Sequence, residues 1–217
     1  NLSGPDCAKL DNKESKRWWE AVCETQRQLN GKARVIHVMD READSYELYA
    51  QLLERRYRFV IRADDRTCLF DGEHTRIKEA LSRQRVIAER EVALTKRTTH
   101  TTAPRSARPV RDARMARLSV TSCEVTLKRP KSLGAEIPER LTLNVVHVFE
   151  PAPPEGEAPV EWFLLTTEPI ETDAQLLRVI DIYRQRWVIE EFFKALKTGC
   201  LYQERQLESL DALLIAL

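Results

Sequence analysis

The sequence lacks the features of membrane-spanning and secreted proteins. None of its apolar runs approaches the roughly 18 residues that a bilayer crossing needs. The first residues, NLSGPDCAKLDNKESKR, contain no apolar core of a signal peptide. These absences predict a cytoplasmic protein.

Cysteine is scarce and scattered. The five cysteines form an odd total and include no C-x-x-C pair. They are Cys7, Cys23, Cys68, Cys123 and Cys200. This distribution argues against a zinc site and against a disulfide framework.

The chain also has almost no net charge. Its formal charge of +1 argues against a uniformly basic nucleic-acid binder, although an average conceals local clusters. Of its 217 residues, 42% are hydrophobic and 32% are charged. That composition predicts a globular protein with a substantial core.

One stretch is nevertheless strongly basic, with a single acid, Asp112, among its cations. Pro104, Pro109 and the run TTHTTAP predict a loop or an irregular hairpin tip over residues 96–117. The cations are Lys96, Arg97, Arg105, Arg108, Arg111, Arg114 and Arg117. Such a loop is either a solvated surface segment or a contact surface for phosphates.

Strands and helices alternate in the first 63 residues. Residues 13–29 fit a helix, residues 34–39 (RVIHVM) fit a short apolar strand, and another helix follows Asp40. A second strand is expected at 57–61. A strand, an acidic turn and a helix indicate an α/β unit, so we assign residues 1–63 to the first part of an α/β core.

The middle of the chain, residues 64–160, predicts a mostly β insertion with one short helix near 77–81. Its clearest alternating runs are 86–94, 118–127 and 141–149.

The last part, residues 161–217, is assigned to the core again. Residues 162–166 fit a buried strand, and 173–198 fit one long helix that ends at Gly199. A further amphipathic helix begins at 208 and has no terminator, so we expect the chain to be cut there.

The long helix carries four polar side chains at intervals of three, four and seven residues: Tyr183, Arg186, Glu190 and Lys197. At about 100° of rotation per residue, they fall within a stripe of about 60°. A phenol, a guanidinium, a carboxylate and an ammonium side by side suit the handling of a phosphodiester. The alternative is an ordinary solvated face, supported by an i, i+4 pair of Glu190 with Lys194.

Apolar residues lie on the opposite flank of this helix and are expected to be buried. They are Val188, Ile189, Phe192, Ala195 and Leu196.

Asp40 lies where the first strand ends. Ligands gather at the carboxyl ends of strands in open α/β sheets, and a carboxylate there can bind a hard cation such as Mg²⁺. The alternative is that Asp40 only caps the next helix.

The spacing of Tyr183, Arg186, Glu190 and Lys197 resembles the Y-R-E-K signature of DDE transposases of bacterial insertion sequences. Their subgroup includes the fourth-numbered insertion sequence and the fifth-numbered composite transposon. Five segments resemble the family in its order along the chain. They are KESKRWW, VMDREADSYEL (38–48), RFVIRA (58–63), EWFLLTTEPI (161–170) and LRVIDIYRQRW (177–187).

The resemblance implies an RNase H-like core in which Asp40 and Glu190 are catalytic and bind a pair of Mg²⁺ or Mn²⁺ ions. It implies that Tyr183, Arg186 and Lys197 contact phosphates of the transposon end. Glu191 lies about 100° around the helix from Glu190 and receives no role.

The resemblance also implies that Trp162 stacks near a base flipped from the duplex end, although a Trp at the head of a buried strand is as readily explained as core. Arg62 matches a family arginine near the same pocket. With these residues nearby, the basic stretch is better explained as a phosphate contact. Its DNA-binding candidates are Lys96, Arg97, Arg105 and Arg108.

The implied activity is cut-and-paste transposition by a dimer on double-stranded DNA. The family nicks the transposon end, forms and reopens a hairpin, and joins the end to target DNA. The location implied is the bacterial cytoplasm, at the nucleoid when DNA is bound. Two alternatives are a degenerate or domesticated DNA-binding protein that does not cut, and a metal-dependent nuclease of the same fold.

The family has a further catalytic aspartate, on a strand upstream of Asp40. Before Asp40 this chain offers only Asp6 and Asp11 in polar sequence without a strand pattern. Asn1 is not an initiator methionine, so we expect a fragment that begins after the first two or three core strands and is inactive by itself.

Overall fold

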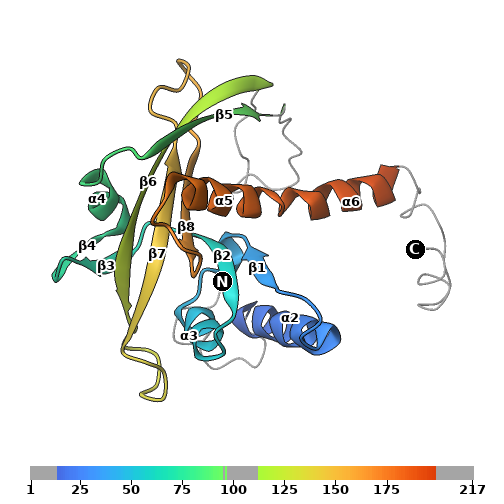
Figure 1. Ribbon diagram of the computed structural model, residues 1–217, viewed down its shortest axis with the longest axis vertical. Coiled ribbons are helices and arrows are strands. Elements are labelled where there is room, and N and C mark those ends of the chain that lie inside the picture. The colour runs from blue at the N-terminus through green and yellow to red at the C-terminus, as the bar shows by residue number, and fades with distance from the viewer. Residues whose placement is uncertain (1–13, 95, 97–111, 199–217) are drawn as a thin grey trace. The chain divides into compact units, whose positions relative to one another are not determined.

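Eight strands of the described residues form one continuous sheet (Figure 1). The computed structural model describes residues 14–94, 96 and 112–198. The chain divides into two units, Asn1–Tyr183 and Arg184–Leu217. The strand order is β1 (Ile36–Met39), β2 (Arg58–Ala63), β8 (Glu161–Thr166), β7 (Arg140–Phe149), β6 (Arg114–Lys128), β3 (Thr67–Phe70) and β4 (Glu73–Arg76), with β5 (Ala88–Leu94) also paired to β6.

The sheet is mixed. Strands β1 and β2 run parallel, with Ile36 beside Arg58 and Met39 beside Ile61. The other pairs are antiparallel, including β2 with β8 and β8 with β7. The predicted α/β class is therefore confirmed at the level of a mixed sheet combined with helices.

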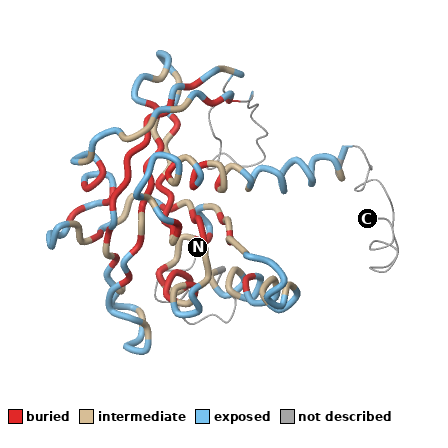
Figure 2. The backbone as a smooth tube through the Cα atoms, in the orientation of Figure 1, coloured by how far each residue is buried: buried red, intermediate tan, exposed pale blue. Residues whose placement is uncertain are grey.

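Helices cover both faces of the sheet. On one face, α2 (Glu14–Leu29), α3 (Tyr46–Glu54) and α4 (Ile77–Ser82) contribute to one hydrophobic cluster. On the other face, α5 (Asp173–Arg184) contributes to a second cluster. Successive strand residues point to opposite faces, which is why both clusters draw on the same strands. Figure 2 shows buried residues along the strands and along the helices that flank them.

Residues 64–160 supply β3 to β7 and the short helix α4. Their strands share one sheet with β1, β2 and β8, because β8 pairs with β2 on one side and with β7 on the other. The division into a core and an insertion stays a prediction, since hydrogen bonding runs across the boundary.

The basic stretch is shorter than predicted. Strands β5 and β6 pair as a hairpin with Leu94 opposite Arg114, so β6 includes part of the predicted 96–117 loop. Arg114 donates to the buried carboxylate of Glu150, and Arg117 donates to Glu89 across the hairpin. The prediction was wrong here because the neutralising acids are distant in sequence and close in the sheet.

The single helix predicted over 173–198 was also wrong. The structure has α5 up to Arg184, a turn at residues 185–186, and α6 (Trp187–Thr198). The last buried residue of α5 is Tyr183. Because packing stabilises most helices in proteins, α5 ends soon after its buried face ends. In the described part of the chain, no helix has both the length and the apolar character that a membrane crossing requires.

Most apolar residues of α6 are exposed in the described part of the structure. Val188 is 61% exposed, Ile189 49% and Phe192 52%. The described residues of their own unit therefore do not cover them. The helix has the amphipathic pattern of a packed helix, and the burial of this flank against another part of the protein stays a prediction.

We expect Leu165→Ala to lower the free energy of unfolding by about 2–5 kcal/mol, because it removes a fully buried side chain and leaves a cavity. The matched control is Met115→Ala on β6, where the side chain is 60% exposed and the expected change is within about 0.5 kcal/mol. Urea denaturation followed by circular dichroism measures both. Similar losses for the two variants would contradict the described core.

Candidate functional site

Asp40 directly follows β1 and begins the short 3-10 helix η1 (Arg41–Ala43). Its Oδ1 accepts a hydrogen bond of 3.0 Å from the backbone N–H of Glu42. The capping role that the sequence left open is therefore present, although for η1 and not for the longer helix. A carboxylate accepts at about four positions, so the cap is compatible with a second role as a metal ligand.

Arg62 lies at the equivalent position of the neighbouring strand. Met39 pairs with Ile61 in the parallel β1–β2 register, so one further step places Asp40 beside Arg62. Arg62 Nη2 donates to the carbonyl oxygen of Glu161 at 3.2 Å. The residue after that carbonyl is Trp162, so Arg62 lies close to the predicted base-stacking residue.

Trp162 and Tyr183 contact each other. Their ring centroids are 5.7 Å apart at an interplanar angle of 56°. Trp162 is partly buried, and Tyr183 is only 2% exposed. Tyr183 therefore belongs to the core on the α5 face. Its phosphate contact and the stacking role of Trp162 stay predictions.

Glu190 of α6 forms an ion pair with Arg186, which lies in the turn just before this helix. Arg186 Nη1 donates to Glu190 Oε1 at 2.7 Å, and the two side chains are 17% and 47% exposed. The guanidinium of Arg186 also lies over the ring of Trp187, 4.8 Å from its centroid. The predicted partner Lys194 was therefore wrong, because Glu190 pairs toward the start of its helix.

The four signature residues are not on one helix. Tyr183 belongs to α5, Arg186 lies in the turn, and Glu190 and Lys197 belong to α6. The turn breaks the regular rotation on which the predicted stripe depends. The side chain of Lys197 lies outside the described part of the structure.

Asp40 and Glu190 belong to different units. Their convergence on one cation pair therefore stays a prediction. Among the basic candidates, Lys96 Nζ lies 3.4 Å from Asp112 Oδ1. Three others lie outside the described residues, as do both upstream aspartates: Arg97, Arg105, Arg108, Asp6 and Asp11.

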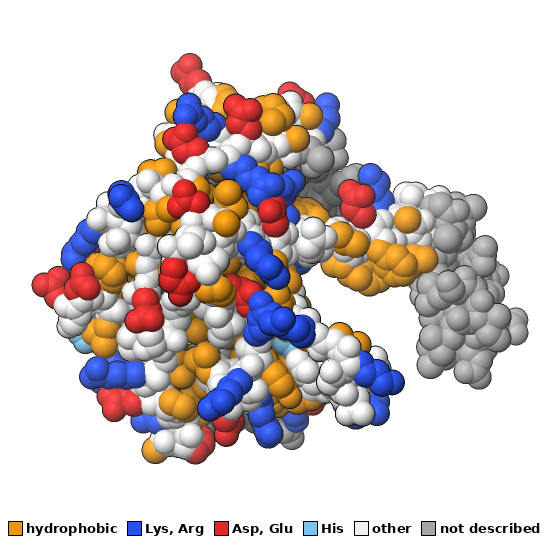
Figure 3. All heavy atoms as spheres, viewed as in Figure 1, with side chains coloured by type: hydrophobic (Ala, Val, Ile, Leu, Met, Phe, Trp, Pro, Cys, Tyr) orange, Lys and Arg blue, Asp and Glu red, His pale blue; other side chains and the backbone are white. Residues whose placement is uncertain are grey.

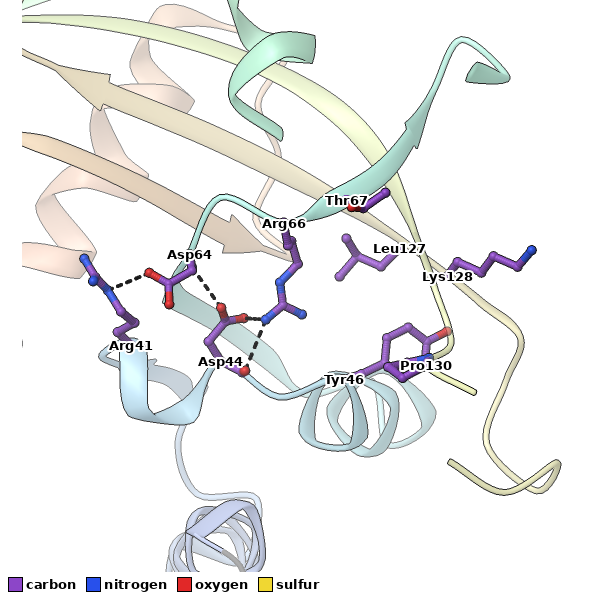
Figure 4. Close-up of a pocket in the computed structure, with 9 residues that line it drawn as sticks. All are labelled: Arg41, Asp44, Tyr46, Asp64, Arg66, Thr67, Leu127, Lys128 and Pro130. Carbon is purple, nitrogen blue, oxygen red and sulfur yellow. Dashed lines mark hydrogen bonds and ion pairs between the residues drawn. The ribbon is translucent and has the colours of Figure 1, made fainter. Parts of the chain in front are cut away.

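Sequence reasoning missed Asp44, which fixes the turn after Asp40. Its carboxylate is 5% exposed and accepts from Tyr49 Oη at 2.7 Å and from the backbone N–H of Asp64 at 2.8 Å. It also pairs with Arg66, which donates to the Asp44 carbonyl oxygen at 3.1 Å. Figure 4 shows Asp44 between Arg66 and Asp64, with Arg41 beyond Asp64.

These contacts surround a pocket of about 320 Å³. Arg41 Nε lies 3.0 Å from Asp64 Oδ1, so ion pairs join η1 to the segment that follows β2. Burial raises the pKa of Tyr49 well above its ordinary value, and the negative charge of Asp44 adds to the effect. Tyr49 therefore stays a neutral donor. The signal in the sequence was a second acid four residues after Asp40.

A comparison with known protein families identifies the family of this chain. A family model described as transposase DDE domain matches residues 11–217, nearly the whole chain. The chain belongs to the transposase DDE domain family. Enzymes of this family act on DNA in transposition and recombination, so the site described above belongs to a transposase domain.

Transposase DDE domains use divalent metal ions, and the donors present fit such ions in kind. Asp40 and Glu190 offer carboxylate oxygens, which Mg²⁺ prefers. Among the described residues, no three His, Cys, Asp or Glu side chains form a group that could hold a metal.

We expect Asp44→Asn to lower the free energy of unfolding of the transposase domain by about 2–3 kcal/mol. The change keeps the shape but removes the charge that Arg66 pairs with, and it sets an NH₂ group against existing donors. Urea denaturation measures the loss.

The matched control is Asp64→Asn, because the Asp64 carboxylate is 62% exposed and its pair with Arg41 is on the surface. It should change stability by less than about 1 kcal/mol. Equal losses for the two Asp→Asn variants would show that Asp44 does not fix this turn.

Proposed function

We propose that this chain is the catalytic domain of a cut-and-paste transposase of the Y-R-E-K subgroup. The reaction is phosphoryl transfer at transposon ends, with nicking, hairpin formation, hairpin opening and strand transfer. The substrate is double-stranded DNA, both as transposon ends and as target. The parent protein acts as a dimer on two ends.

The observation that supports this most is the position of Asp40. It lies at the carboxyl end of a strand that runs parallel to its neighbour, where α/β proteins place their ligands. Arg62, Trp162 and Tyr183 gather near the same end of the sheet on the α5 face. An acid, a guanidinium and two aromatic rings would serve a backbone phosphate and an unstacked base.

The family match also favours an RNase H-like core, in which Asp40 and Glu190 are ligands of Mg²⁺ or Mn²⁺. Such ions, when bound, activate a water or a 3′-hydroxyl and stabilise the leaving oxygen of an in-line displacement. Asp40 and Glu190 would hold them through oxygen atoms. The hydrogen bond from Arg186 orients the Glu190 carboxylate.

The basic side chains have a separate task in this proposal. Arg186 and Lys197 would bind phosphates of the transposon end, together with Arg62. Lys96 and the basic residues 97, 105 and 108 would contact more distant phosphates, with little dependence on sequence. Tyr183 would support Trp162 through ring contact, in addition to the phosphate contact expected from its position in the signature.

A second candidate is a degenerate DNA-binding relative that does not cut. It is favoured by one observation, that the described residues contain no group of three metal-ligating side chains. This reading keeps the roles of Trp162 and the basic stretch and removes those of Asp40 and Glu190. It predicts DNA binding that is insensitive to both carboxylates.

We expect Asp40→Asn and Glu190→Gln each to reduce cleavage more than about 100-fold in the complete gene product, because even residues that only orient metal ligands cost about 10–100-fold. The substrate is the pair of DNA ends that flank the gene, with Mg²⁺ or Mn²⁺. Gel electrophoresis of end-labelled DNA measures nicks, hairpins and joined products.

Glu191→Gln is the matched control, since Glu191 adjoins Glu190 and points elsewhere on the helix. It should cleave within about twofold of the unchanged protein. Binding of the same DNA should survive in all three variants. Cleavage that is unaffected by Asp40→Asn and Glu190→Gln would contradict the proposal, and binding without any cleavage would favour the second candidate.

A further inference from the structure

A pocket of about 420 Å³ lies at the amino ends of β1 and β2, away from Asp40. Its lining includes Arg34, Arg58 and Arg178, from three separate parts of the chain. Glu168 is the acid in the lining. In Figure 3, blue Lys and Arg side chains gather near the middle of the larger unit.

Arg58 is held in place by Glu168. Its Nε donates to Glu168 Oε1 at 2.8 Å, and its Nη2 bonds the second carboxylate oxygen. The Glu168 side chain is 4% exposed and that of Arg58 is 34% exposed. The buried carboxylate of Glu168 thus orients the Arg58 guanidinium and leaves its Nη1 as a further donor. A fixed guanidinium loses little entropy when it binds an oxyanion.

Arg34 and Arg178 differ from Arg58. Both are exposed, and within the described residues neither side chain has a carboxylate partner or a hydrogen bond. Three arginines and one glutamate give the lining a formal charge of 3 − 1 = +2. Exposed arginines repel one another, so a lining with two uncompensated positive charges favours an anionic ligand.

The pocket lies one strand length from Asp40. Residues Ile36 and Arg58 start the parallel pair, and Asp40 follows its other end. At about 3.3 Å per residue, four residues separate the two sites by about 13 Å. One turn of duplex DNA is about 34 Å long, so a single duplex is long enough to contact both ends of the strands.

We propose that this pocket binds backbone phosphates of duplex DNA, at a site separate from the one at Asp40. Two phosphodiesters balance its formal charge of +2. Arg58, oriented by Glu168, supplies a fixed donor, and Arg34 and Arg178 supply the uncompensated charge. The inference rests on the proposed function in taking DNA as the polyanion, but it needs no cleavage to be tested.

The test is the salt dependence of binding to a 40-base-pair duplex of arbitrary sequence, measured by fluorescence anisotropy in EDTA. For Arg34→Gln/Arg178→Gln, the slope of log K against log salt should become less steep by about 1.8, because each phosphate contact contributes about 0.9. At about 0.1 M salt, affinity should fall on the order of 10–100-fold. Arg58 is left unchanged because its loss would leave the buried carboxylate of Glu168 without its partner.

The matched control is Arg85→Gln/Arg140→Gln, which removes the same charge from two exposed arginines that do not line this pocket. It should keep the slope within about 0.5 of the unchanged protein. Arg34→Lys/Arg178→Lys keeps both charges and should keep most of the slope. Thermal melting shows whether each variant is folded.

A slope that is the same for the pocket variant as for the unchanged protein would overturn the proposal. Equal flattening in the pocket and control variants would also overturn it, since net charge alone would then explain the effect. These outcomes are separate from the cleavage assay. If Asp40→Asn leaves cleavage unchanged while the pocket variant binds DNA with a less steep salt dependence, the catalytic role of Asp40 is contradicted and the phosphate site is supported.

Discussion

The parallel pairing of β1 with β2 is the constraint on which the candidate site depends. It sets the carboxyl ends of both strands at one edge, so Asp40 and Arg62 become neighbours although 21 residues separate them in the chain. Parallel strands need a crossover between them, and η1 with α3 supplies it. The same pairing sets Arg58 at the amino ends of the two strands. One register therefore determines the positions of both Asp40 and the arginine pocket.

The crossover must also leave β1 in a fixed direction, and the contacts of the Asp44 side chain fix that direction. Its carboxylate joins η1, α3 and the segment after β2 through Tyr49, Asp64 and Arg66. A buried carboxylate with several donors is costly to disturb, because each donor would be left without its partner. The turn that presents Asp40 is thus held by side chains and not by η1 alone, which is too short for stability of its own.

The sequence predicted most of the strands and helices, because apolar periodicity records which side of an element is buried. It failed where the deciding contact is distant. Arg114 and Arg117 were predicted to lie in a basic loop, because Glu150 and Glu89 approach them only in the folded sheet. The turn at 185–186 has no Pro or Gly to mark it. The β3–β4 hairpin, by contrast, had a local signal in Asp71–Gly72, both with positive φ, that was not used.

Near-neutral net charge and DNA binding are compatible in this chain because its ion pairs are unevenly distributed. Several arginines of the sheet are neutralised by acids, as Arg114 is by Glu150. Arg34 and Arg178 retain their charge beside a pair, Arg58 and Glu168, that is already balanced. A polyanion responds to local uncompensated charge within about a Debye length, roughly 10 Å, and not to the total. The structure therefore identifies the basic surface that composition conceals, since only the fold reveals which cations are already paired.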